Sequence, residues 1–377
     1  MFAQRKWMAI SLGLFLVLGR TAGAQTDDRQ PVTGALVMPP GDNPPPVSGA
    51  LVWPSTDSIN YGTCDPLWTA SAEGLFLNRS RPAHQSLLVD NAGTSIYDAN
   101  QLDFPTQLGW EIDVQRRVCC DWSVEALYFQ LGGENAKDLT LSTFGAGVPY
   151  NTPPAATGIF GGPGPVLTGL DYSSKLQNVE FNARRELTPN VSLLAGVRYL
   201  GLYEDGLTIE QLATFSNPSP ALPSLIGDIQ KFSVFNNLIG FQVGADATFL
   251  RWGRFSLEGN FKAGIYGDAA SNRISYDYAS TSPLALYHFV SGTTGGSAAF
   301  VGELGIRETC QIVGGWSIFA GYDLLWIDGV ALASQQAAAN PSPNPSPGNT
   351  WFGPASNVQM GSSLFYQGAT AGVEFRY

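Results

Sequence analysis

From residue 68 onward, apolar and polar side chains alternate with a period of two. In a β-strand successive side chains point to opposite faces, so this period predicts strands with one apolar and one polar face. At 255–265 one face would carry Phe255, Leu257, Phe261, Ala263 and Ile265, and the other Ser256, Glu258, Asn260, Lys262 and Gly264. A fold built from strands is therefore expected.

Ten segments follow this pattern, and most reach the ~9–11 residues that a tilted strand needs to cross a bilayer. They are 68–78, 109–117, 122–131, 172–185, 191–203, 233–248, 255–266, 297–307, 316–326 and 363–377. A membrane-spanning helix is excluded over the same region, because no window after the first twenty residues has the ~18 unbroken apolar residues that it needs.

The connections between these segments alternate strictly in length. The long ones are 79–108, 132–171, 204–232, 267–296 and 327–362, and the short ones are 118–121, 186–190, 249–254 and 308–315. Outer-membrane barrels have long loops outside and short turns on the periplasmic side. We therefore predict an all-β fold, a transmembrane antiparallel up-and-down β-barrel of about ten strands, with twelve as the alternative.

Aromatic residues gather at both ends of the predicted strands, as they do where barrels meet the lipid headgroups. The periplasmic ends carry Trp68, Trp122, Trp252, Phe255, Trp316, Phe375 and Tyr377. The outer ends carry Tyr128, Tyr172, Tyr203, Phe235, Tyr266, Phe300, Trp326 and Phe365. We expect two aromatic girdles facing outer-membrane lipid.

The residues before the barrel predict export and a separate leader. Residues 1–24 resemble a secretory signal peptide, with a basic start at Arg5 and Lys6, an apolar run and a small-residue cleavage site. Residues 25–67 are rich in proline and contain a duplicated segment, 31–39 and 46–54. We expect an extended periplasmic leader, and alternatively each copy could dock as an added strand or in the barrel mouth. Together with the barrel, these features predict that the protein is located in the outer membrane of a Gram-negative-type envelope.

Charged residues within the strands fall on the polar face. A cationic side chain facing lipid near the midplane costs roughly 2–4 kcal/mol, so these residues are expected to face the lumen. They are Glu111, Asp113, Arg117, Glu125, Glu180, Arg184, Arg198, Asp246, Glu258, Lys262, Glu303, Arg307, Asp323, Glu374 and Arg376. Their mixture of signs predicts ion pairing across the barrel.

Several short motifs, taken in order, resemble the bacterial family called beta barrel porin-7. They are Glu73-Gly74-Leu75-Phe76-Leu77, Val124-Glu125-Ala126-Leu127-Tyr128, Gly196-Val197-Arg198-Tyr199, Gly302-Glu303-Leu304-Gly305 and the run 320–327. The resemblance implies an outer-membrane barrel over roughly 68–377 and brings no catalytic residues with it. The end of the chain, Phe375 and Tyr377, resembles the aromatic signal read by the barrel-assembly machinery.

Four cysteines map to the periplasmic side of this topology, where disulfides form. Cys119 and Cys120 lie in the first short turn, Cys64 just before the first strand, and Cys310 in a turn several strands away. Because the first two strands are neighbours, we predict one disulfide from Cys64 to either Cys119 or Cys120, with free thiols as the alternative.

The function predicted from sequence is a narrow porin-like channel whose lumen charges are paired, with small ions or solutes as its cargo. Ten strands lie near the size at which side chains fill a barrel. A structural or surface-interaction barrel presenting long outer loops is the alternative. A hydrolase is remote, because only His84 and His288 offer candidate bases and both fall in predicted loops. With 20 basic and 31 acidic residues, the chain is too acidic to be expected to bind nucleic acid. No cofactor or metal site is predicted.

Overall fold

The computed structural model describes residues 67–90, 94–142, 146–147, 166–215, 224–281, 284–339 and 357–377. All of them belong to one compact unit, 61–377. The predicted signal peptide and nearly all of the predicted leader lie outside the described residues. Among the helices that are described, none is long and apolar enough to cross a membrane.

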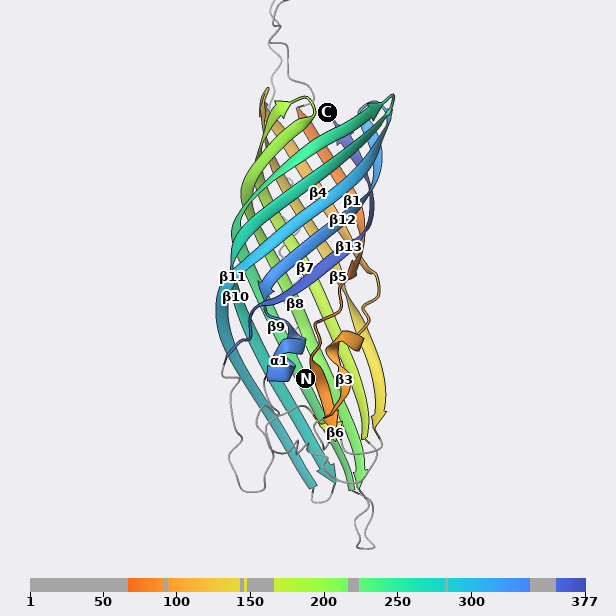
Figure 1. Cartoon of the computed structure of the whole chain (residues 1–377), viewed down its shortest axis with the longest axis vertical. Helices are drawn as coiled ribbons and strands as arrows, with labels where there is room; N and C mark the ends of the chain where they lie inside the picture. Colours follow the sequence, from red (N-terminus) through yellow and green to blue (C-terminus); the bar gives the residue numbers. More distant parts are fainter. Residues whose placement is uncertain are drawn as a thin grey trace, which may run out of the picture. The chain divides into compact units, whose positions relative to one another are not determined.

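Ten antiparallel strands close into a barrel, which confirms the predicted fold class (Figure 1). They are β1 (Trp68–Arg79), β4 (Gln107–Cys119), β5 (Trp122–Ser142), β7 (Val166–Thr188), β8 (Val191–Phe215), β9 (Ser224–Trp252), β10 (Phe255–Thr281), β11 (Leu284–Val313), β12 (Trp316–Val330) and β13 (Ser362–Arg376). Each pairs with its neighbour in sequence, and β13 pairs with β1 to close the ring.

One end of the barrel carries only tight turns, as the short connections predicted. The turn between β11 and β12 is Gly314-Gly315, and both residues have positive φ. Two positive φ values match a two-residue hairpin turn to the twist of its strands, and glycine adopts them without steric cost. We call this the turn end and the opposite end the loop end. In outer-membrane barrels the turn end faces the periplasm.

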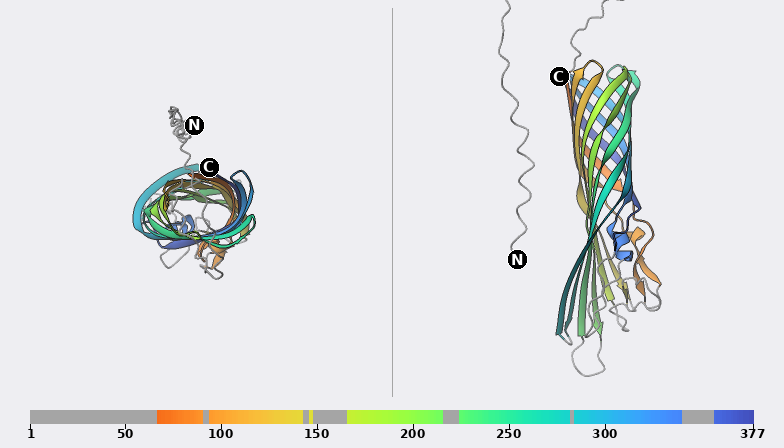
Figure 2. Two further views of the ribbon diagram at one scale, coloured as in Figure 1. Left: turned by 90° about the horizontal axis from the view of Figure 1, so that it is seen from above. Right: turned by 90° about the vertical axis from the view of Figure 1, so that its left-hand side faces the viewer.

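At the loop end the strands are longer than the sequence predicted. The connections 132–171, 204–232 and 267–296 were expected to be loops, whereas β5 and β7 to β11 continue into them (Figure 2). β10 pairs with β11 without a break from Phe255 to Thr281. This prediction is wrong because membrane thickness does not limit a strand whose inner face is buried beyond the bilayer. Ile274 and Tyr276, on the extension of β10, are both buried.

The two other long connections also contain regular structure where loops were predicted. Residues 79–108 hold β2 (Ser86–Asp90), β3 (Ser95–Asp98) and a 3-10 helix, η1 (Ala99–Gln101), and residues 327–362 hold α1 (Ala333–Ala339). A short strand, β6 (Ala146–Gly147), pairs with β2. β2, β3, η1 and α1 pack against the extended strands in one apolar core, which includes Leu87, Leu102, Tyr172, Phe232 and Ala337.

A second apolar cluster lies inside the barrel. We call it the apolar layer, and it draws side chains from every barrel strand except β4. Its members are Leu75, Leu77, Leu127, Phe129, Leu131, Leu176, Leu200, Leu202, Leu238, Tyr266, Ala299, Val301, Leu325, Ile327, Val330, Leu332, Leu364 and Tyr366. The prediction of an outer aromatic girdle is therefore wrong at Tyr266 and Tyr172, because both side chains are buried inside the barrel instead of facing lipid.

Closure between β1 and β13 depends on the end of the chain. The backbone N–H groups of Leu67 and Trp68 both donate to the carbonyl of Tyr377, and Tyr377 donates to Trp68. The ring of Phe375 contacts Trp316 with centroids 4.7 Å apart. Deleting Phe375 to Tyr377 should leave the chain unassembled in the periplasm, and cell fractionation measures this. Removal of residues 28–30 is the matched control, and normal membrane levels of the C-terminal deletion would contradict the expectation.

Candidate functional site in the barrel lumen

The fifteen charged residues singled out in the strands lie along the inner wall. Glu125, Glu180, Arg198, Lys262 and Glu374 are buried, and Arg376, at the turn end, is the most exposed. The other nine are half-buried: Glu111, Asp113, Arg117, Arg184, Asp246, Glu258, Glu303, Arg307 and Asp323. The period of two orients them, because the neighbouring positions in the sequence are apolar and face outward. Phe261, beside Lys262, is one of these and is 51% exposed.

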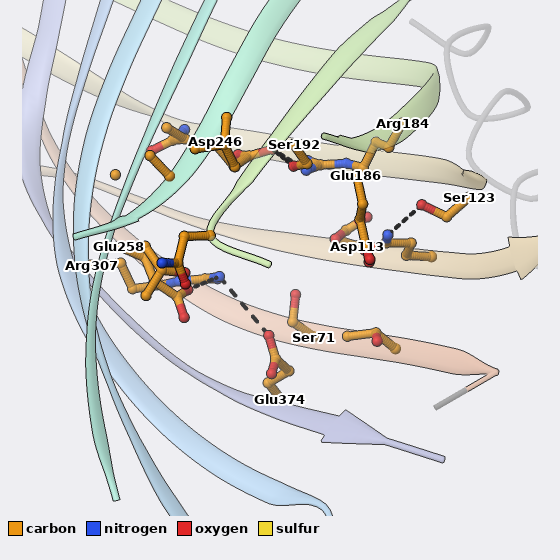
Figure 3. A pocket seen from close by; sticks show the side chains of 18 of the residues that line it. Ser71, Asp113, Ser123, Arg184, Glu186, Ser192, Asp246, Glu258, Arg307 and Glu374 are labelled. Atoms are coloured by element: carbon orange, nitrogen blue, oxygen red, sulfur yellow. Dashed lines mark hydrogen bonds and ion pairs between the residues drawn. The ribbon is translucent and has the colours of Figure 1, made fainter. Parts of the chain in front are cut away.

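Twelve of these residues line a cavity of about 520 Å³ at the turn end (Figure 3). Its wall also includes Pro189 and Asn190 in the β7–β8 turn and Arg251 near the end of β9. The cavity is therefore reached from the turn end. We call it the turn-end cup.

The three remaining residues, Glu125, Glu180 and Arg198, take part in the paired network beside the cup. Glu180 accepts hydrogen bonds from Gln242 Nε2 at 2.7 Å, Asn178 Nδ2 at 2.9 Å and Lys262 Nζ at 3.1 Å. Arg198 Nη1 lies 3.4 Å from Glu180 and 3.0 Å from Glu303. Two cations, on β8 and β10, thus share two carboxylates, on β7 and β11, which satisfies charges that are hidden from water.

Further pairs follow the wall toward the turn end. Arg184 forms ion pairs with both Glu125 and Asp246. Arg307 Nη2 lies 3.1 Å from Glu258 and 3.9 Å from Glu374. Figure 3 shows both arginines bridging strands across the cup wall. Ion pairs therefore connect the strands around much of the lumen wall.

Sequence reasoning missed three features of the lumen. The first is Glu73, which shares the inner face of β1. The second is Arg79, which forms a buried ion pair with Glu204 at 2.5 Å. Glu204 also accepts hydrogen bonds from the Tyr172 hydroxyl and, at 2.7 Å, from the backbone N–H of Ala333 at the start of α1. The third is the apolar layer. Its signal was the run 199–203, where the alternation is lost and both faces of the strand carry large side chains.

The two histidines do not form a common site. His84 is exposed beside Asp98 and Asn100, whereas Nδ1 of His288, on the β11 extension, lies 2.5 Å from Asp277 Oδ1 on β10. Within the described ranges, no group of three or more histidine, cysteine or acidic side chains could hold a metal ion.

The cysteines of the first turn differ from one another. Cys120 is disulfide-bonded, and Cys119 and Cys310 are free thiols. The partner predicted for this bond, Cys64, lies outside the described residues. Mass mapping of the non-reduced protein should therefore find Cys120 in a crosslinked peptide. Replacing Cys120 with Ser should abolish that peptide, and the matched Cys119→Ser should leave it in place. A crosslink that survives Cys120→Ser would contradict the assignment.

Three solved structures are similar to this chain at low sequence identity. The outer membrane protease OmpT from Escherichia coli is similar at 10% identity and a TM-score of 0.42, covering 86% of this chain and 100% of that one. The toluene transporter TbuX from Ralstonia pickettii is similar at 9% identity and a TM-score of 0.29, covering 83% and 90%. A FadL homologue from Pseudomonas aeruginosa shares 8% identity at a TM-score of 0.25, covering 82% and 89%.

A search of curated proteins found no match. The model of the family described as "Putative beta barrel porin-7" matches residues 164–377, more than half of the chain and seven of the ten barrel strands. That family was expected from the order of the short motifs, and the match confirms it. The protein is an outer-membrane β-barrel and belongs to the beta barrel porin-7 family.

Proposed function

We propose that this protein is a closed outer-membrane barrel that presents a folded platform at the cell surface, instead of an open pore. The apolar layer carries this proposal. Leu176, Leu200, Leu202 and Leu238 are each fully buried in it, and they lie on three adjacent strands. Leu176 lies opposite Leu202, and Leu200 lies opposite Leu238. An ion that crossed the layer would lose its water among side chains that, apart from Tyr266 and Tyr366, are hydrocarbon, which is costly.

The loop end supports the second half of the proposal. An open porin has a wide aqueous mouth, whereas here β2, β3, η1 and α1 pack against the extended strands. The buried Arg79–Glu204 pair joins β1 to β8, and Glu204 also binds the start of α1. These contacts suit a rigid platform that holds the remaining loop segments outside the membrane.

Surface labelling of intact cells tests this arrangement. A peptide tag inserted between β5 and β7, at 150–160, should be labelled, because that connection lies at the loop end. The matched tag at Asn190, in the β7–β8 turn, should be labelled only after the outer membrane is permeabilised. The opposite pattern would reverse the orientation and remove the platform from the cell surface.

A narrow, weakly cation-selective channel is the second candidate. The acid-rich wall of the turn-end cup favours it, because fixed negative charge attracts cations. The two candidates differ in their response to Arg198→Ala, which frees Glu180 and Glu303 from a cation. In a channel, both conductance and cation preference should rise. In the closed barrel, neither should change, because the apolar layer is untouched.

The proposal includes no enzymatic activity and no cofactor. It assumes that residues 1–24 are removed on export and that the barrel-assembly machinery recognises the end of β13. Outer-membrane lipid is then the partner of the apolar outer face, where Phe241 and Ile265 are among the most exposed side chains.

A further inference from the structure

The turn-end cup has more acids than cations to pair with them. Six cations line the cup, and five of them already have a carboxylate partner, whereas the sixth, Arg251, donates to the carbonyl of Pro189 at 3.2 Å. Arg117 pairs with Glu186, Arg184 with Asp246, Lys262 with Glu303, and Arg307 and Arg376 with Glu374. Within the described part of the chain, three acids of the cup form no ion pair, namely Glu111, Asp113 and Asp323. The cup therefore holds three carboxyl groups that no cation pairs with.

These three acids occupy one wall instead of being spread around the cup. Glu111 and Asp113 lie two residues apart on the inner face of β4, and Asp323 extends from β12. Between β4 and β12 lie only β1 and β13. The Oδ1 atom of Asp113 is buried and has no hydrogen-bond partner among the described residues. A buried carboxylate oxygen without a donor is costly, so this position favours an added donor.

Strand pairing strengthens the same conclusion. Glu111 lies directly opposite Glu73 on β1. Two carboxylates directly opposite one another destabilise a sheet when both are ionised, so a cation beside this pair would favour the register. Positions where residues destabilise the fold locally are expected to be functional sites.

We propose that the turn-end cup binds a small organic cation with two or more amino groups, which enters from the periplasm. Ammonium groups are donors without acceptors, and each can meet a separate carboxylate along the wall. A volume of about 520 Å³ lies in the range of small-molecule sites. The three unpaired acids of this wall lie on β4 and β12, which are separated by two strands, and this suits an elongated ligand with spaced charges. The site goes beyond the proposed platform function and does not depend on whether the lumen conducts.

Isothermal titration of the purified full-length protein with spermidine tests the site. We expect saturable binding of one spermidine per barrel that weakens with added salt, because the contact is between charges. Asp113→Asn should weaken the affinity about tenfold or more, as expected when a charge-assisted hydrogen bond is lost. The dicarboxylate succinate should not bind.

The matched control is Asp103→Asn. Asp103 is an exposed acid outside the cup, where it pairs with Arg81 at 3.0 Å, and its replacement should leave spermidine affinity unchanged. Asp323→Asn gives a second test within the cup, and heat-modifiable gel mobility shows whether each variant is folded. Absence of binding, or equal affinity in the folded Asp103, Asp113 and Asp323 variants, would overturn the proposal.

Discussion

Replacing Glu180 with Gln should destabilise the folded barrel by about 3–5 kcal/mol, as expected when one partner of a buried ion pair is removed. Glu180 is fully buried, and its loss leaves Arg198 and Lys262 to share Glu303, at 3.0 and 3.4 Å. Because those cations remain hidden from water, the variant keeps their desolvation cost and loses most of the compensation. Urea unfolding in lipid vesicles, followed by tryptophan fluorescence, measures the free energy of unfolding.

The matched control is Glu258→Gln, the same chemical change in the same lumen. The Glu258 side chain is 21% exposed and its partner Arg307 is 35% exposed, so water screens the pair. Removing such a partly exposed pair should cost about 1 kcal/mol or less. If the Glu180 variant loses no more stability than the Glu258 variant, burial does not determine the strength of the lumen network.

Replacing Phe261 with Arg should cost about 2–4 kcal/mol, because it places a cation against lipid near the bilayer midplane. Phe261 lies six residues from the turn end of β10 and is 51% exposed on the outer face. Its neighbour Lys262 is a buried cation on the opposite face. The prediction therefore tests the assignment of the two faces as well as the depth of the strand. Unfolding in vesicles again provides the measurement.

Phe249→Arg is the comparison at the edge of the membrane. Phe249 is 65% exposed and lies three residues from the turn end of β9. A cation near the interface should cost only ~0–1 kcal/mol. Equal losses at the two positions would mean that Phe261 does not face the hydrocarbon core.

The period of two and the loop-length alternation together predicted the strand count, the pairing order and the inward orientation of Glu180 and Arg198. These are local properties, since every second residue of a membrane-crossing strand must be apolar. Strand ends at the loop end could not be predicted in the same way. Ile274 lies on the extension of β10, and it is buried in an apolar core with residues of η1, β2 and α1, which are distant in sequence.

The candidate site was predicted only in part, for a similar reason. Their place on the polar face of the strands identified Glu111, Asp113 and Asp323 as lumen residues. The alternating pattern could not tell paired acids from unpaired ones. Pairing depends on which side chains from non-adjacent strands meet across the barrel, as Lys262 on β10 meets Glu180 on β7. The apolar layer was missed because a hydrophobic residue on the lumen face looks, in sequence, like a break in the pattern.

Electrical recording from the unmodified protein in a planar bilayer tests most directly whether the lumen is closed. The purified full-length chain, inserted from vesicles in which its heat-modifiable mobility confirms folding, should give no steady conductance above the bare bilayer. Leu200 and Leu238, which lie opposite one another on the adjacent strands β8 and β9, then remain buried in the apolar layer. A large and steady conductance in the folded protein would show a continuous aqueous path and would contradict the closed barrel.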